Sequence, residues 1–248
     1  MLAAGRGIRM GGRRPKALIP IGDHEPVLHY VLHGLQRAGI EELMIVTGFR
    51  PAEVQDYVAE QWSDANVAFI RNARYASWGN FHSLRLAIDQ SPGYRILAVN
   101  SDVVVAPDVF ARVVGAPGDL VLAVQQRETL DPEDMRVQLA GDRVVAIGKG
   151  LPMDRSHGEF SGISLLSPRA AAAYADLASA VEWRAETSIY YEDLFALMLD
   201  SLYARWAPVE ADEYAEVDEP SDLAEAAKVI ERHAGAWEEA PPASSEAG

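Results

Sequence analysis

Glycines and basic residues at the start of the chain are spaced as a bound polyphosphate would require. The stretch "LAAGRGIRMGGRRPK", residues 2–16, contains four glycines and five basic residues before the first carboxylate. Glycine adopts positive φ at low cost and has no Cβ, so backbone N–H groups can close on phosphate oxygens. The basic side chains that would add positive charge are Arg6, Arg9, Arg13, Arg14 and Lys16. We predict a polyphosphate-binding loop, with a flexible, solvated loop as the alternative.

An aspartate further along the chain stands where a metal ion could meet those phosphates. In "YRILAVNSD", Asp102 follows an apolar run that is typical of a buried strand. Open α/β sheets bind ligands beyond the carboxyl ends of their strands. Magnesium takes hard oxygen ligands, commonly one or two carboxylates beside substrate phosphates. Asp102 is therefore the first predicted ligand of Mg2+, the cofactor we expect, with a structural role at the strand end as the alternative.

The overall charge argues against several classes of partner. The chain of 248 residues has 37 Asp+Glu against 22 Lys+Arg and a formal charge of -15. This negative field would repel nucleic acid and anionic membranes, so an anionic ligand must be met locally. No apolar run approaches the roughly 18 residues of a membrane span, and the absence of cysteine fits a reducing compartment. We expect a cytoplasmic monomer or homodimer that binds neither nucleic acid nor membrane.

The elements that must position these residues alternate between strand and helix. Short apolar runs at Leu2–Ala4, "ELMIVTG", "NVAFI", "YRILAVNSD" and "DLVLAVQQ" alternate with helical patterns near 27–38, 52–62, 80–90 and 107–114. Such alternation implies right-handed βαβ crossovers. We predict an α/β fold, a Rossmann-like three-layer α/β/α sandwich with a mostly parallel mixed sheet.

The second half of the chain has a different pattern. "RVQLA" and "RVVAIGK" flank "GD", which predicts a β-hairpin and a small antiparallel insertion at one edge of the sheet. A strand "FSGISLLS", helices near 168–179 and 190–202, a strand near 203–209 and a helix near 220–233 follow. We predict a single domain over residues 1–235. The tail 236–248 is rich in Pro, Ser, Ala and Glu and is expected to be disordered.

Several motifs together resemble one enzyme superfamily. "LAAGRGIRM" followed by "PKAL" is similar to the L-A-A-G-x-G-x-R-M…P-K signature of nucleotidyltransferases that make NDP-sugars and related activated alcohols. The distance from Arg9 to Lys16 is similar to the sugar-phosphate type rather than the molybdopterin type. "NARYASWGNFHSL", "GKGLP", "GEFSGISLLSP" and "YYEDLF" resemble the branch that acts on phosphocholine, inositol phosphate or phosphonates. Gly79 and His82 depart from that branch, where a second asparagine and an aromatic ring are common.

The resemblance implies a magnesium-dependent transfer of CMP from CTP to a small phosphorylated or phosphonate alcohol, with release of pyrophosphate. Arg9 would contact the β- and γ-phosphates, and Lys16 the α-phosphate and the acceptor. "EVDEPSD" matches a family segment that supplies a second metal ligand, here Asp218. An alternative role for Asp218 is simply to lead into the helix at Pro220.

Two further groups of contacts are expected. Asn80 and Ser83 lie three apart at a helix start and can face the same way toward a base, although Asn80 could instead cap the helix. The predicted nucleotide contacts are Leu2, Ala3, Ala4, Gly5, Arg6, Gly7, Asn80, Ser83 and Ser101. The predicted acceptor contacts are Lys149, Glu159, Tyr191, Glu192 and Asp193, with Trp183 a further candidate. Carboxylates and aromatic faces would hold a quaternary ammonium; solvated charges and core aromatics are the alternative.

The acceptor is therefore expected to be phosphocholine-like, an aminoethylphosphonate or an inositol phosphate. Two rival functions stay open. One is a uridylyl- or thymidylyltransferase acting on a sugar 1-phosphate. The other is a non-catalytic regulatory protein that binds a nucleotide with the same loop.

Overall fold

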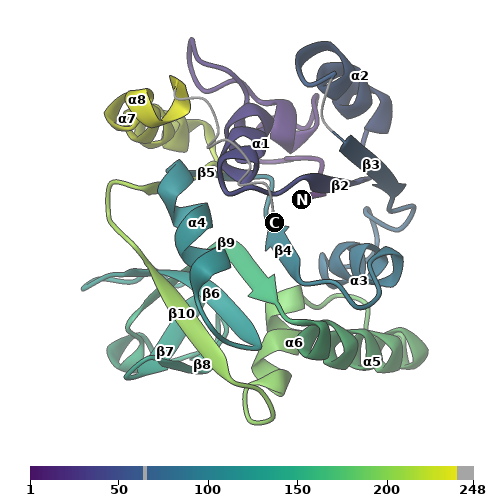
Figure 1. Cartoon of the computed structure of the whole chain (residues 1–248), viewed down its shortest axis with the longest axis vertical. Coiled ribbons are helices and arrows are strands. Elements are labelled where there is room, and N and C mark those ends of the chain that lie inside the picture. The colour runs from purple at the N-terminus through teal and green to yellow at the C-terminus, as the bar shows by residue number, and fades with distance from the viewer. Residues whose placement is uncertain (64–65, 239–248) are drawn as a thin grey trace, which may run out of the picture.

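The chain folds into a mixed sheet covered by helices on both faces (Figure 1). The computed structural model describes residues 1–63 and 66–238. Its first three strands are parallel, in the spatial order β1 (Leu2–Ala3), β2 (Glu42–Thr47) and β3 (Asn66–Arg71). An isolated parallel bridge between Leu2 and Asn100 joins this part to the rest of the molecule.

Six further strands form the larger part of the sheet. In spatial order they are β4 (Ile96–Val99), β9 (Gly158–Leu166), β6 (Leu120–Gln126), β10 (Ala204–Val209), β8 (Arg143–Ile147) and β7 (Arg136–Ala140). The β7–β8 hairpin forms at the edge of the sheet, as predicted. The α/β class is confirmed. Because β9 runs antiparallel to both β4 and β6, the sheet is more strongly mixed than the alternating elements indicate.

Alternate residues of the strands supply two separate cores. In β6, Val121 and Ala123 face one core, whereas Leu120, Leu122 and Val124 face the other, as the two-residue period of a strand requires. The first core is covered by α1 (Val27–Arg37), α2 (Pro51–Gln61), α4 (Pro107–Gly115), α7 (Leu223–Arg232) and α8 (Ala234–Glu238). The second is covered by α3 (Phe81–Gln90), α5 (Pro168–Arg184) and α6 (Tyr191–Met198).

A short two-stranded ribbon was not expected from the sequence. Strands β5 (Val103–Val105) and β11 (Tyr214–Glu216) pair antiparallel, with Glu216 opposite Val103. The Val217 N–H extends this pairing by donating to the Asp102 carbonyl at 2.7 Å. The ribbon therefore joins the segment after β4 to the segment before the last long helix.

The C-terminal boundary differs from the prediction. Residues 236–238, assigned to a disordered tail, belong to α8. Trp237 is buried and its ring packs edge-on against Tyr30 of α1, with centroids 5.0 Å apart. Burial of this large aromatic surface explains why the helix persists past residue 235. The rest of the predicted tail, residues 239–248, lies outside the described residues.

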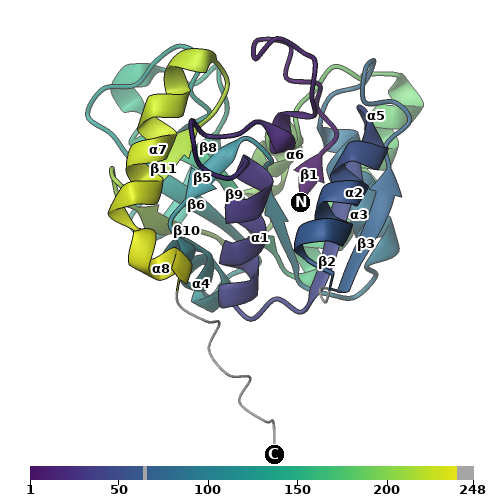
Figure 2. The same cartoon turned by 90° about the horizontal axis from the view of Figure 1, so that it is seen from above.

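The loop that follows β1 lies at one rim of the molecule. Figure 2 shows this loop (purple) above α1.

Among the residues that the structure describes, no helix has both the length and the apolar content to cross a bilayer.

Close packing between α1 and α4 generates a prediction about stability. A Cβ at Gly34 would overlap the Phe110 ring. We expect Gly34→Ala to lower the free energy of unfolding by about 1–3 kcal/mol, the usual cost of overpacking. Urea unfolding measures this. Gly115→Ala, where nothing lies within 4 Å of the added methyl group, is the matched control and should cost nothing. Equal stability of both variants would contradict the packing described.

Candidate active site

A cavity of about 650 Å³ lies beside the loop that follows β1. Its wall includes the opening loop, the segment after β4, and loops and helix ends of the second half. Its charged lining residues are Arg6, Arg9, Lys16, Asp102, Glu133, Asp134, Lys149, Glu159, Glu192, Glu216 and Asp218. Acidic side chains thus outnumber basic ones even in this cavity.

Lys16 is the centre of a cluster of opposite charges. Its Nζ donates to Asp102 Oδ2 at 2.9 Å and also to Asp218 Oδ1. Arg9 Nη2 lies 2.7 Å from Asp218 Oδ2. Burial alone would lower the pKa of Lys16, but the carboxylates of Asp102 and Asp218 outweigh it and raise this pKa. Arg9, Lys16 and Asp218, which the family resemblance singled out, therefore meet Asp102, which was predicted from its place after a strand.

Local backbone geometry explains how distant segments meet. Gly7 has φ of 61°, and a Cβ there would lie 3.2 Å from Lys16 Cβ, so glycine allows the loop to close over the lysine. Lys16 itself begins a short 3-10 turn, η1 (Lys16–Leu18). On the other side, pairing of β5 with β11 holds Asp102 beside Asp218.

A third carboxylate completes the cluster and was missed in the sequence. Oxygens of Asp102, Glu216 and Asp218 all lie within 4.8 Å of one another. Burial, together with the charges of Asp102 and Asp218, raises the pKa of Glu216 to about 8. The signal was available, because Glu216 precedes Asp218 by two residues and side chains at that spacing along an extended strand share a face.

This oxygen-only set fits a hard divalent cation such as Mg2+. Asp102 Oδ1 is buried and has no hydrogen-bond partner among the described residues. An oxygen in that state is costly to bury without a partner. A cation bound by the three carboxylates would supply one.

The other basic residues of the opening loop have different surroundings. The Arg6 Nε donates to the Gly12 carbonyl at 3.2 Å, and its guanidinium lies 5.2 Å from the centre of the Phe49 ring. Arg14 lines a separate surface pocket together with Glu53. The sequence suggested that all the basic residues of this loop face one ligand. In the structure they do not, because Arg14 lines a different pocket.

A smaller cavity of about 170 Å³ adjoins the first and shares Lys16 and Asp102 with it. Its wall contains six of the predicted nucleotide contacts, namely Leu2, Ala4, Gly5, Asn80, Ser83 and Ser101. Arg6 and Gly7 line the larger cavity instead. Ala3 belongs to the hydrophobic core. Lys16 and Asp102 thus stand at the junction of two compartments.

Hydrogen bonds fix the polar groups of the smaller cavity. The Ser83 hydroxyl accepts from Asn72 Nδ2 at 2.9 Å, which leaves its own O–H free to donate. Asn80 Oδ1 accepts from the Tyr191 N–H at 2.9 Å and makes no side-chain cap to α3. Asn80 therefore ties the start of α6 to the start of α3, a role that neither sequence alternative foresaw.

Gly79 allows these two segments to touch. Its N–H donates to the Thr187 carbonyl at 2.6 Å. A Cβ at this position would overlap the Ile189 carbonyl oxygen. The departure from the family pattern at position 79 thus has a steric reason in this chain.

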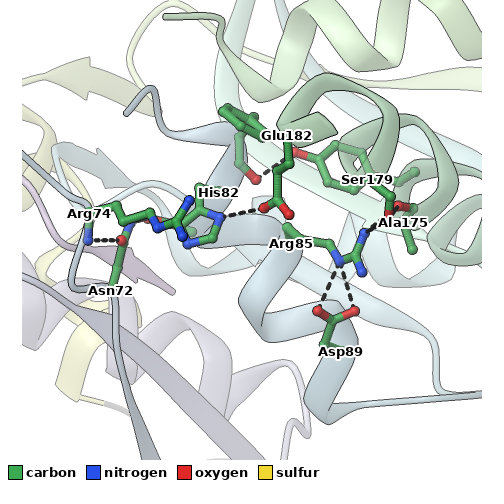
Figure 3. A network of polar contacts seen from close by, with 11 residues as sticks. Asn72, Arg74, His82, Arg85, Asp89, Ala175, Ser179 and Glu182 are labelled. Carbon is green, nitrogen blue, oxygen red and sulfur yellow. Dashed lines mark hydrogen bonds and ion pairs between the residues drawn. The ribbon is translucent and has the colours of Figure 1, made fainter. Parts of the chain in front are cut away.

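Polar contacts attach α3 to α5 (Figure 3). His82 Nδ1 lies 2.7 Å from Glu182 Oε1. Arg85 contacts the Ala175 carbonyl and the Ser179 hydroxyl. His82, the other departure from the family pattern, is therefore held in the helix-to-helix contact.

The acceptor residues predicted from the sequence divide into two groups. Glu159 and Glu192 are buried and line the larger cavity, as does Lys149. Glu159 Oε2 pairs with Arg127 Nη1 at 3.0 Å, and burial raises the pKa of Glu159 to about 7. Lys149 Nζ lies 3.2 Å from Glu133 Oε2.

Tyr191, Asp193 and Trp183 do not form an aromatic and acidic cage. The Tyr191 side chain is 1% exposed, packs in the core, and its hydroxyl donates to Asn100 Oδ1 at 2.9 Å. Asp193 Oδ2 accepts from the Tyr190 N–H at 2.8 Å and so caps α6. Trp183 is 91% exposed. Helical spacing explains this, because successive residues of a helix face different directions.

Comparison with known proteins gives a consistent assignment. A family model described as a MobA-like NTP transferase domain matches residues 1–189. CMP-5'-(3-aminopropyl)phosphonate synthase of Streptomyces rubellomurinus is 31% identical over 47% of this chain and 19% of that protein. The bifunctional protein GlmU of Azorhizobium caulinodans is 27% identical over 93% of this chain and 52% of its own. The chain thus spans only part of the length of these relatives.

Two solved structures share the fold. The inositol-1-phosphate CTP transferase from T. maritima has a TM-score of 0.77 at 19% identity, covering 93% of this chain and 94% of its own. The CTP:phosphocholine cytidylyltransferase from Streptococcus pneumoniae has a TM-score of 0.74 at 20% identity, covering 92% and 96%. The family match confirms the resemblance to the nucleotidyltransferase superfamily, and the two cytidylyltransferase structures share the fold.

The charge cluster predicts strong energetic coupling. Lys16→Met leaves Asp102 and Asp218 without their ammonium partner and should lower stability by about 1–3 kcal/mol in a chelating buffer, because buried charges lose a partner. Asp102→Asn should cost much less in the Lys16→Met background than in the natural chain. Urea unfolding of the four proteins gives the coupling energy. Additive effects, or an equal loss in Arg14→Met, would contradict the cluster.

Proposed function

Because the chain belongs to the MobA-like NTP transferase domain family, we propose that this nucleotidyltransferase transfers CMP from CTP to a small phosphorylated or phosphonate alcohol. One observation carries the proposal. Lys16 lies at the junction of the two cavities and contacts both Asp102 and Asp218. With the base in the smaller cavity and the acceptor in the larger one, the α-phosphate and the attacking oxygen would meet beside this ammonium.

The reaction is a substitution at phosphorus. An acceptor oxygen forms a bond to the α-phosphorus, the bond between the α-phosphorus and the bridging oxygen breaks, and pyrophosphate leaves with that electron pair. The protein has little covalent work in such a transfer, so positioning and charge stabilisation carry the catalysis. Lys16 would hold the α-phosphate and the acceptor. Arg9, with a side chain 61% exposed, would contact the β- and γ-phosphates.

Magnesium is proposed as the cofactor, with Asp102, Asp218 and Glu216 as its protein ligands. Their oxygens are close enough together, and the orphaned Asp102 Oδ1 supports the choice. When bound, the ion would neutralise phosphate charge and orient the triphosphate. Lys16 and Arg9 form ion pairs with two of these carboxylates, Asp102 and Asp218.

The smaller cavity supports a pyrimidine nucleotide. Ser83 lines this cavity, and its O–H can donate to a pyrimidine edge. The backbone of Ala4 and Gly5 lines the same space. The likeness to CTP-using structures supports CTP as the donor.

The larger cavity supports a small charged acceptor. Lys149 is the proposed contact for the acceptor phosphate or phosphonate, whereas Glu159 and Glu192 would meet the remainder of the molecule. The relative that makes a CMP-aminopropylphosphonate supports a phosphonate among the candidates.

Removal of the first metal ligand tests the assignment. With CTP, Mg2+ and an accepted phospho-alcohol, Asp102→Ala should reduce pyrophosphate release by about 100-fold or more, because charge stabilisation at the reacting phosphates is lost. Asp108→Ala, which removes an exposed carboxylate from α4, should leave the rate unchanged. Full activity of a folded Asp102→Ala protein would refute the metal assignment.

A substrate panel separates this function from its rivals. CTP, UTP, dTTP and GTP are each combined with phosphocholine, inositol phosphate, 2-aminoethylphosphonate and hexose 1-phosphates. We expect CTP with a non-sugar acceptor to give the highest kcat/KM. Turnover of UTP or dTTP with a hexose 1-phosphate would establish the sugar-nucleotide function. Tight triphosphate binding without turnover of any pair would indicate a regulatory protein.

A further inference from the structure

Arg136 is a buried cation that does not pair with the carboxylate opposite it. It is the first residue of β7 and is 6% exposed. Glu159 lies directly opposite in the pairing of β7 with β9, and the side chains of such a pair stand on the same face of a sheet. Glu159 nevertheless pairs with Arg127. Within the described part of the chain, no carboxylate forms an ion pair with Arg136, so its charge is not used to neutralise an acid.

The guanidinium of Arg136 donates instead to backbone carbonyls of two separate loops. Its Nη1 donates to the carbonyls of Asp131 at 2.7 Å and Pro132 at 3.0 Å. These belong to residues 127–135, the loop between β6 and β7. Its Nε donates to the Leu151 carbonyl at 2.8 Å, in residues 148–157, the loop between β8 and β9. The planar fork of arginine suits such a link, which holds the two loops together.

Both loops contribute side chains to the larger cavity. The first supplies Glu133, Asp134 and Met135, and the second supplies Lys149. Arg136 itself is not among the described residues that line this cavity. Its contacts therefore set the position of the wall from behind it.

Backbone pairing fixes the ends of the loops and leaves their middles to side chains. The Arg127 N–H donates to the His157 carbonyl at 3.3 Å, and the Gly148 N–H to the Arg136 carbonyl at 2.9 Å. Lys149 and Glu133 also link the loops, but the Glu133 side chain is 85% exposed, and exposed ion pairs contribute little. Of these two side-chain links, that of Arg136 is the buried one.

Burial of an unpaired guanidinium is costly. The β7–β8 hairpin does not require it, because these strands pair through their backbones. Local conflicts of this kind are commonly retained at functional sites. The residue that the Arg136 link would serve is Lys149, two positions before Leu151 and the proposed contact for the acceptor phosphate or phosphonate.

We propose that Arg136 is a positioning residue for the acceptor. By holding the two loops together, it places Lys149 where the ammonium meets the anionic group of the acceptor. The inference rests on the proposed nucleotidyl transfer and deepens it, because it assigns part of acceptor recognition to a residue that touches neither substrate.

Separate KM values for the two substrates test the proposal. With CTP, Mg2+ and an acceptor that the natural chain uses, Arg136→Met should raise KM for the acceptor by about tenfold or more, because small misplacements of a positioning group are costly. KM for CTP should stay unchanged. An equal rise in both KM values, or a fall in kcat alone, is the mark of a general structural defect and would overturn the role.

Arg143→Met is the matched control. Arg143 lies in the same hairpin and donates to the Leu202 carbonyl at 3.2 Å, away from both loops. Its removal should change neither KM value. A rise in the acceptor KM equal to that of Arg136→Met would mean that any loosening of the hairpin suffices, and would count against Arg136.

A double-mutant cycle tests whether Arg136 acts through Lys149. Lys149→Ala should lower kcat/KM for the acceptor, and Arg136→Met should have a much smaller effect in that background than in the natural chain. Additive losses would contradict the proposed route. If Arg136→Met does not fold, Arg136→Lys takes its place, because an ammonium keeps the charge but lacks the fork. It too should raise KM for the acceptor alone, and an unchanged value would overturn the proposal.

Amide hydrogen exchange separates failure of the inference from failure of the proposed function. If the natural chain turns over no pair of substrates, the proposed function fails. Exchange in Arg136→Met, or in Arg136→Lys, then tests the positioning alone. Faster exchange confined to residues 127–135 and 148–157 supports it, because local opening speeds exchange. Unchanged exchange in these loops overturns it.

Discussion

Pairing of β5 with β11 is the constraint on which the candidate site depends. Each strand has three residues, and together they hold carboxylates from distant parts of the chain within reach of one ion. Such short strands have little stability of their own. They persist because Val104 and Ala215 are buried in the core beneath α1 and α7. The positions of the clustered carboxylates are therefore fixed by the packing of β5 and β11 in the core.

Repulsion between carboxylates in the cluster is opposed by ion pairs with nearby basic side chains. Three carboxylates within 4.8 Å repel one another, and Lys16 and Arg9 offset this repulsion through their ion pairs with Asp102 and Asp218. The same cations are the groups suited to triphosphate binding. Although the chain has a formal charge of -15, Lys16 and Arg9 bring positive charge to this cluster, and functional sites commonly carry such local conflicts.

The sequence predicted those features that follow from hydrophobic periodicity or from a recognised motif. The long helices, the β7–β8 hairpin and the grouping of Lys16 with Asp102 and Asp218 belong to this class. Contacts set by tertiary packing were beyond those patterns. β5 and β11 are too short to show alternation, Asn80 bonds to a helix far along the chain, and which of Tyr191 and Glu192 faces the cavity depends on the exact start of α6.

The contact at Gly79 gives the two compartments a common wall. Thr187 and Ile189, which precede α6, contact the backbone of Gly79 at the wall of the smaller cavity, and Asn80, which lines both cavities, accepts a hydrogen bond from the first residue of α6. Glu192 is the next residue along that helix. Under the proposed function, the base and the acceptor would share this wall, so an engineer who reshapes one cavity would have to redesign the other as well.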